Sequence, residues 1–287
     1  MAIIGTRPYD FMVKYTPQKE WIEGHGILLA FAFFFGGISG GLYLASLYFD
    51  SMLGMFIAWL LALLMGIVDL AHLSKPMRSW RMVLKPKTSW ITRGLIFATL
   101  FIGCAAIQLA LSYWLAGNVA ETVFKVLAGI TAFGVAIYSG FVVGYVSAIK
   151  LWNSAIVPIL FIIAGVTGGL AILLAIRLDN AAAVMEIMRV VLIAYAVFMA
   201  IYIWIATYGG EAARDSVVRI IRGSIAPVFW IGVVLLGIVA PIVILFTASA
   251  GASAALIITV IFVIIGGVAL RYVILKAGMY SPLVPAE

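Results

Sequence analysis

Long apolar runs separated by short polar connections make up most of this chain. A helix needs ~20 residues to cross a hydrocarbon core of ~30 Å, and eight runs meet this length: 26–49, 54–74, 91–115, 123–148, 154–176, 182–208, 227–247 and 254–275. The runs lack the period-two alternation of a closed β-barrel, which leaves helices as the lipid-facing structure. We therefore predict an all-α integral membrane protein with eight transmembrane helices.

Composition agrees with this pattern. The chain is 66% hydrophobic and 10% charged, with a mean hydropathy of +1.22, whereas soluble domains are about 45–50% apolar and about 25% charged. We predict one membrane domain over residues 1–287, divided into a polar segment 1–25, a first four-helix half 26–148, a second half 154–275 and a tail 276–287. Residues 1–25 lack an apolar core before a small-residue cleavage site, so we expect no signal peptide.

A glycine-rich motif occurs twice. Residues 37–42 read GISGGL, and 128 residues later residues 165–170 read GVTGGL. An even number of crossings separates the two motifs, so their helices run in the same direction. This spacing favours two parallel four-helix bundles that arose by duplication. Chance is the alternative, because small residues are common wherever membrane helices pack closely.

The net charge of +7 is distributed unevenly. With eight crossings, both ends of the chain lie on one face, which we call face A. Fifteen of the eighteen Lys and Arg residues fall on face A, and the positive-inside rule would place that face in the cytoplasm. The basic balance is therefore a topology signal, and we expect no nucleic-acid partner.

A long polar connection inside the apolar sequence follows the second run, at residues 75–90. It is rich in Trp and Arg, whose side chains have an apolar part and a polar end and are typical of membrane–water interfaces. We predict that this connection on face A docks a partner protein through Arg78, Trp80, Arg81, Trp90 and Arg93.

Asp69 and Tyr138 are polar residues inside predicted spans, toward face A. An ionisable group at membrane depth is costly and is by default a functional candidate. Asp69 either pairs with Arg93 or Arg271, or accepts a proton, and the two roles are compatible. Tyr138 needs a hydrogen-bond partner when buried, which is either a neighbouring protein group or a ligand oxygen.

Histidines occur at two positions near face A, His25 at the start of the first span and His72 at the end of the second. Solvation or capping is the more common role of such a residue, and hydrogen bonding to a ligand is the functional alternative. The pair is also a candidate for axial ligation of one haem.

Near the opposite face, face B, Glu186 and Arg189 are three residues apart and share one helical face, so they can pair. A role in proton transfer is the second interpretation. Cys104 is the single cysteine and is expected to be a buried apolar residue. No residue spacing suggests a metal site or a nucleophile beside a base.

Several motifs together resemble the NrfD-type family of polysulphide-reductase membrane subunits. The run 69–94, DLAHLSKPMRSWRMVLKPKTSWITRG, is similar to the family's Asp-Leu-Gly pattern with following Pro, Arg, Trp and Ser-Arg-Gly. Ala71 and Thr92 are small departures from that pattern. Further matches are the first-span glycines, Tyr138-Ser139-Gly140, Trp152-Asn153-Ser154 with Pro158, Ala226-Pro227 with Phe229-Trp230, Arg271-Tyr272 and Ala277-Gly278.

The resemblance implies a haem-free membrane anchor in a prokaryotic cell (inner) membrane that exchanges electrons with menaquinone or ubiquinone during anaerobic respiration. Its partners would be a ferredoxin-like iron–sulfur subunit and a molybdopterin catalytic subunit, which carry the iron–sulfur clusters and molybdopterin. The quinone pocket would involve His25, Asp69 and Tyr138, with protons handled by Asp69, Glu186 and Arg189. Family members often dock exported partners on the outer face, opposite to the side that the positive-inside rule indicates.

Two rival functions remain at this point. A secondary transporter is favoured by the repeat and by glycine runs that would unwind at the membrane midplane. A haem-b anchor is the other rival.

Overall fold

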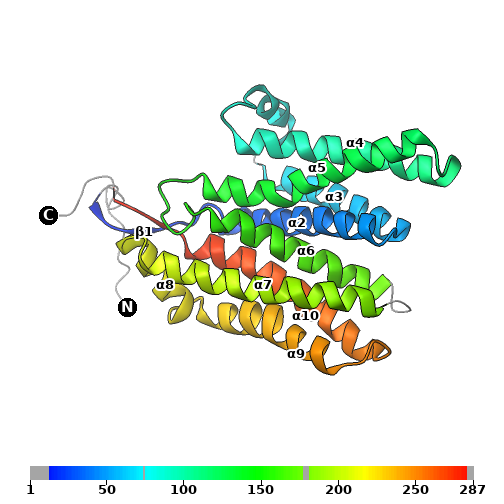
Figure 1. Cartoon of the computed structure of the whole chain (residues 1–287). Coiled ribbons are helices and arrows are strands. Elements are labelled where there is room, and N and C mark those ends of the chain that lie inside the picture. The colour runs from blue at the N-terminus through cyan, green and yellow to red at the C-terminus, as the bar shows by residue number, and fades with distance from the viewer. Residues whose placement is uncertain (1–12, 74, 177–180, 283–287) are drawn as a thin grey trace.

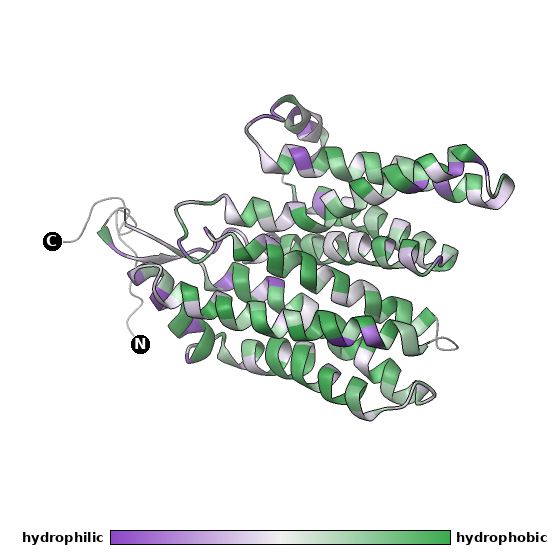
Figure 2. Cartoon of the chain, viewed as in Figure 1, coloured by the Kyte–Doolittle hydropathy of each residue, from purple (hydrophilic) through white to green (hydrophobic). Residues whose placement is uncertain are grey.

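Helices that run side by side make up the protein (Figure 1). The computed structural model describes residues 13–73, 75–176 and 181–282. Eight helices in this part of the chain are long and apolar enough to cross a membrane, which confirms the predicted fold class. Figure 2 shows apolar residues along most of their length.

The spans follow the predicted runs closely. Their bounds are α2 Ile27–Tyr48, preceded by the short helix η1 Gly24–Gly26, then α3 Met52–His72, α4 Trp90–Trp114, α5 Val119–Gly144, α6 Ile156–Ile176, α7 Ala181–Thr207, the pair η4 Val228–Val239 and α9 Ala240–Thr247, and α10 Ser253–Ala277. Side chains cap three of the helices: Ser51 accepts from Gly54 N, Ser89 from Thr92 N and Asn118 from Ala120 N. Such caps satisfy backbone donors that have no partner within the helix.

The seventh span has an irregular backbone. Its first part, η4, is a π-helix, and its second part, α9, begins beside Pro241. Proline provides no backbone N–H to the helix, and π segments are uncommon distortions of α-helices. In contrast, α2 and α6 remain continuous through their glycine runs.

Helix α2 lies at the centre of the bundle and packs on α3, α5, α6 and α10. Its most apolar window is 67% buried, against 28% for α3, α4 and α7, so those three helices face lipid most. The two glycine motifs meet where α2 crosses α6. A Cβ on Gly165 would lie 2.5 Å from the Gly37 carbonyl oxygen, and a Cβ on Gly169 would collide with the backbone of Gly41 and Leu42.

The two halves of the chain repeat several contacts. Helix α2 packs on α3 and α5, as α6 packs on α7 and α10, and α5 packs on α4 as α10 packs on η4 and α9. These contacts agree with a duplicated unit. The grouping into two separate bundles, and the division at residues 148 and 154, stay predictions because α2, α5, α6 and α10 also pack across the halves.

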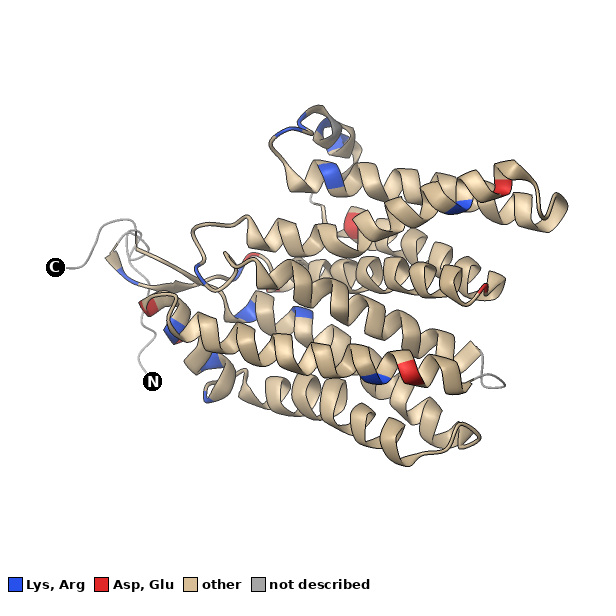
Figure 3. Cartoon of the chain, viewed as in Figure 1, with Lys and Arg blue, Asp and Glu red and all other residues tan. Residues whose placement is uncertain are grey.

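Face A carries structure that the sequence pattern treated as connections. The strand β1 Thr16–Pro17 pairs with β2 Met279–Tyr280 in antiparallel register. The amphipathic helix α8 Glu211–Ile221 buries Ala212, Ala213, Ser216, Val217 and Ile220 along one side, and the 3₁₀ segment η2 Pro76–Leu84 lies between α3 and α4. Figure 3 shows most Lys and Arg residues at this end of the helices.

Candidate functional site

A cavity of about 590 Å³ lies near face A among the helices of the first half. Helix α3 contributes Met65, Gly66, Asp69, Leu70 and His72, and α4 contributes Ile91, Gly94, Leu95, Ala98, Thr99 and Ile102. The rest of the wall comes from the N-terminal segment, α2, η2 and α5: Glu20, Trp21, Leu29, Phe33, Leu73, Ser79, Met82, Tyr138 and Val142. Most of these side chains are apolar, so the few polar groups stand out.

Asp69 and Tyr138 come together in this cavity from α3 and α5. The carboxyl and the phenol line the same cavity and are close enough to influence each other electrostatically, and the Tyr138 hydroxyl points to Met65 Sδ at 3.8 Å. In the described part of the chain, Asp69 forms no ion pair with Arg93 or Arg271. Arg93 donates to the Pro86 and Lys87 carbonyls, and Arg271 to the Gly267 and Phe161 carbonyls. The carboxyl is therefore available to a ligand.

Tyr138 is held in one orientation by its neighbours. Its ring meets Phe33 edge to face, with ring centroids 6.3 Å apart. Gly94 of α4 lies against the ring, and a Cβ there would lie 2.6 Å from Tyr138 Cε2 and closer still to Cδ2. The glycine thus provides the space in which the phenol is positioned.

The two histidines occupy different surroundings. His72 lines the cavity, and its Nδ1 contacts the His25 backbone carbonyl oxygen at 3.0 Å. Because a carbonyl only accepts, Nδ1 carries the hydrogen and Nε2 of the neutral ring is left as an acceptor. The His25 side chain is exposed and does not line the cavity. The structure therefore brings Asp69 and Tyr138 together with His72, and it leaves His25 outside.

The cavity wall includes residues exposed on the outer surface of α3 and α4, two of the least buried spans. Leu70 of α3 and Ile91 of α4 both line the cavity, and they are 47% and 51% exposed. These apolar residues stand on helices that face lipid. A lipid-soluble molecule can therefore reach Asp69 and Tyr138 from the membrane.

The residues predicted to dock a partner divide into two groups. Arg78, Trp80 and Arg81 are exposed on η2, and the Arg81 guanidinium lies 5.5 Å from the Trp80 ring centroid. We call this exposed set, with Lys75, Lys85 and Lys87, the basic shelf.

Arg93 and Trp90 are used within the chain. The Arg93 guanidinium lies 4.4 Å from the Trp90 ring centroid, and Trp90 stacks on Phe141 at 4.2 Å. With the bonds to Pro86 and Lys87, these contacts fix the loop before α4. Both residues are partly buried, so they support the basic shelf from below.

Comparison with known proteins agrees with the fold and the motifs. Residues 22–282 match the family described as Polysulphide reductase, NrfD. The chain belongs to this family. The C subunit of polysulfide reductase from Wolinella succinogenes is 26% identical over 167 residues, which cover 54% of this chain and 53% of that protein. The chain thus spans about half the length of the curated relative it matches.

At face B, this NrfD-family chain pairs Glu186 with Arg189. The Arg189 Nη1 lies 2.6 Å from Glu186 Oε1, and its Nε donates to the Leu245 carbonyl oxygen at 2.9 Å. None of these residues lines the cavity at face A. The pairing follows the expected three-residue spacing, and its role in proton transfer stays a prediction.

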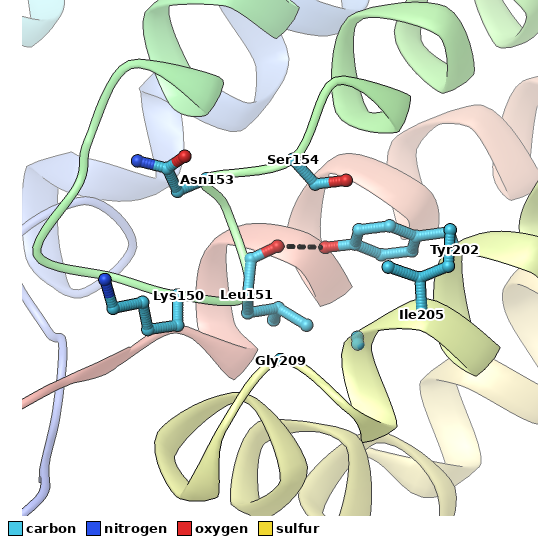
Figure 4. A pocket seen from close by; sticks show the side chains of 8 residues that line it. Lys150, Leu151, Asn153, Ser154, Tyr202, Ile205 and Gly209 are labelled. Carbon is cyan, nitrogen blue, oxygen red and sulfur yellow. Dashed lines mark hydrogen bonds between the residues drawn. The ribbon is translucent and has the colours of Figure 1, made fainter.

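A smaller cavity of about 230 Å³ lies between the α5–α6 loop and the end of α7 (Figure 4). Lys150, Asn153 and Ser154 line it, and the Tyr202 hydroxyl donates to the Leu151 carbonyl oxygen at 3.0 Å. The neighbouring Trp152 is fully buried and donates to the Ile274 carbonyl at 2.7 Å. The Trp-Asn-Ser motif of this family member therefore ties the loop to α10.

From the sequence, His72 was one of two histidine candidates but was not chosen for the quinone site, and Gly94 was given no role. His72 follows Asp69 by three residues and so lies on the same side of α3. Gly94 belonged to a recognised motif, yet its role depends on the Tyr138 ring, which comes from another helix.

We predict that Gly94→Ala displaces the Tyr138 ring and lowers the stability of the protein in detergent by about 1–3 kcal/mol, the usual cost of overpacking. Thermal unfolding would measure the loss of stability. Replacing the ring by a smaller side chain, in the double variant Gly94→Ala with Tyr138→Leu, should remove most of the loss caused by the added methyl group. Gly66→Ala is the matched control, because Gly66 lines the same cavity and a Cβ there meets nothing within 4 Å. Equal losses in both single variants would contradict this role of Gly94.

Proposed function

We propose that this chain is the quinone-reactive membrane subunit of an oxidoreductase complex, and that the Asp69–Tyr138 cavity binds the quinone. The observation that carries the proposal is the convergence of a carboxyl and a phenol in an apolar cavity that lies beneath the basic shelf and is walled in part by exposed residues of α3 and α4. Its volume of about 590 Å³ falls within the range of about 300–1,000 Å³ typical of small-molecule sites. Membership of the NrfD family supports the same assignment.

Quinol oxidation releases two electrons and two protons, and the cavity offers groups for both protons. Tyr138 donates a hydrogen bond to one quinone oxygen. The Asp69 carboxylate and the free Nε2 of His72 accept the two protons, since both groups line the cavity. Groups that accept protons close to the reacting atoms are suited to proton-coupled electron transfer. Run in reverse, the same groups return protons to a reduced quinone.

The basic shelf is proposed as the docking surface for a ferredoxin-like iron–sulfur subunit, which receives the electrons. The basic shelf lies on η2 and the loop that leads into α4. Ser79 and Met82 of η2, which are adjacent in sequence to Arg78 and Arg81, line the cavity. A partner seated there would stand next to the quinone. As membership of the NrfD family suggests, a molybdopterin subunit completes the proposed complex in a prokaryotic inner membrane.

The transporter alternative receives less support from the fold. It required helices interrupted at the glycine runs, whereas α2 and α6 are continuous there and use the glycines for packing. For the haem alternative, the His72 Nδ1 is engaged by the His25 carbonyl, and the exposed His25 ring lies outside the cavity that His72 lines. The quinone site therefore agrees better than either alternative with the continuous helices α2 and α6 and with the contacts of the two histidines.

We predict that Asp69→Asn reduces quinol-linked turnover at least ~100-fold, because a proton acceptor is lost. The variant complex should assemble and should bind a quinone analogue within about threefold of the wild type, since the amide keeps the shape of the carboxyl. Steady-state turnover with a soluble quinol, together with copurification of the partner subunits, measures both. Retained turnover would remove Asp69 from the reaction.

A second comparison separates the histidines. We expect His72→Ala to lower kcat/KM for quinol by about tenfold or more, corresponding to one lost hydrogen bond or proton acceptor. His25→Ala should change it by less than about twofold, because only its backbone carbonyl contacts the site. The opposite ranking would return His25 to the quinone site and exclude His72.

For docking, we predict that Arg78→Gln with Arg81→Gln weakens binding of the iron–sulfur subunit about three- to tenfold, as expected for two exposed charge contacts. The difference from the wild type should shrink as ionic strength rises, because salt screens the charges that the wild type keeps. The control is Arg214→Gln with Arg222→Gln, which removes two exposed arginines from face A at α8 and its C-terminal end. Equal weakening by both double variants, measured by salt-dependent copurification, would argue against the basic shelf.

A further inference from the structure

Arg271 of α10 is a charged residue in the interior of the helix bundle. Its side chain is fully buried. Nη1 donates to the Gly267 carbonyl oxygen and Nη2 to the Phe161 carbonyl oxygen, both at 3.1 Å. Within residues 13–73, 75–176 and 181–282, Nε has no hydrogen-bond partner and no carboxylate pairs with the guanidinium. Buried charges are normally paired, so this one requires an explanation.

The position of Arg271 in its half corresponds to that of Tyr138 in the first half. Residues 134–138 read GVAIY and residues 267–271 read GVALR, so the arginine replaces the tyrosine at the end of a repeated segment. The neighbours correspond as well. Phe33 and Phe161 are 128 residues apart, the spacing of the glycine motifs, and each contacts the residue in question: Phe33 meets Tyr138 and Phe161 meets Arg271.

The remaining neighbours of the two residues differ. Met65 of α3 contacts the Tyr138 hydroxyl, whereas Tyr195 of α7, the equivalent helix, lies close enough to Arg271 to influence it electrostatically without a hydrogen bond. Tyr195 is buried and its hydroxyl, like Arg271 Nε, has no partner in the described part of the chain. The second half thus holds a closed, positively charged counterpart of the Tyr138 site.

The two sites adjoin each other across α2. The Phe33 and Phe161 rings are 6.4 Å apart, and the Arg271 guanidinium carbon lies 5.2 Å from the Phe161 ring centroid. On α2, Gly36 lies beside Tyr138, while a Cβ on Gly37 would lie 2.7 Å from Arg271 Nη2. Since Gly36 and Gly37 are consecutive, the guanidinium and the phenol ring are on the order of 10 Å apart.

We propose that Arg271 is a specificity-determining residue of the quinone site, a fixed positive charge behind α2 that favours a negatively charged quinone species in the cavity. The proposal rests on the proposed function of that cavity. At ~10 Å, with the effective dielectric constant of ~20 that describes protein interiors, one unit charge changes the affinity for a monoanion by about tenfold. A neutral quinone of the same shape gains almost nothing from it.

A pair of ligands tests this charge selectivity. 2-Hydroxy-1,4-naphthoquinone is an anion at neutral pH, whereas 2-methoxy-1,4-naphthoquinone is neutral and of nearly the same shape. With the full chain in nanodiscs, we expect Arg271→Gln to weaken binding of the hydroxy compound about tenfold and to change binding of the methoxy compound by less than about twofold. Arg271→Lys keeps the charge and should retain most of the selectivity.

Lys276→Gln is the matched control. It removes a positive charge from the same helix, but Lys276 is partly exposed and pairs with Glu23 at 2.8 Å, so solvent and its partner screen it. We expect it to change the affinity for either compound by less than about twofold. Thermal unfolding of each variant accompanies the binding curves, and Arg271→Met, which also removes the charge, provides the measurement if Arg271→Gln does not fold.

The outcomes distinguish a failure of the proposed quinone site from a failure of the proposed role of Arg271. If neither compound binds the wild type, the cavity is not a quinone site, and the role of Arg271 falls with it. If both bind but Arg271→Gln weakens them equally, Arg271 is a structural residue and the charge proposal is overturned while the quinone site stands. If Arg271→Gln changes neither affinity, the positive charge does not act on the cavity. Should Arg271→Lys lose the selectivity as well, charge is not the cause.

Discussion

Backbone contact between α2 and α6 is the constraint on which the other helices depend. Only glycine fits at this crossing, because a side chain at Gly165 or Gly169 would collide with backbone atoms of α2. Without a hydrophobic force between helices in lipid, such close packing is a main source of association. It draws α2 into the centre, where α3, α5 and α10 also pack on it. Two consecutive residues beside the crossing, Gly36 and Gly37, then face Tyr138 on one side and Arg271 on the other.

From this arrangement the chemistry of the cavity follows. Helix α3 is brought to α2 and presents Asp69, and α5 presents Tyr138 from the other side. Helix α4 packs mainly on α5, and the cavity remains where α3 and α4 stand apart near face A. The cavity is therefore a product of helix packing in the first half. In the second half, the position that corresponds to Tyr138 is occupied by the buried Arg271 side chain.

Hydropathy alone was sufficient to predict the eight spans, because each is a long, predominantly apolar run of the length needed to cross the hydrocarbon core. The convergence of Asp69 and Tyr138 could also be expected, since both lie inside predicted spans toward face A. The orientation of His25 could not. It lies in the 3₁₀ turn η1 before α2, where the helical phase differs from that of the span, so its ring turns outward and its carbonyl meets His72. The surface helix α8 lies between the predicted runs 182–208 and 227–247 and is too short and polar for a search for membrane-spanning runs to find, although its buried positions recur at helical spacing.

The pairing of β1 with β2 has a consequence for how the protein is made. The ribosome delivers β1 before the eight described spans and β2 after them, so Thr16 and Pro17 can pair with Tyr280 and Met279 only after all eight spans have been synthesised. Glu20 and Trp21, which line the cavity, lie a few residues after β1 in the sequence. Their final placement is therefore a late event of biogenesis, and a nascent polypeptide that has inserted only its first four helices does not yet possess a finished binding chamber.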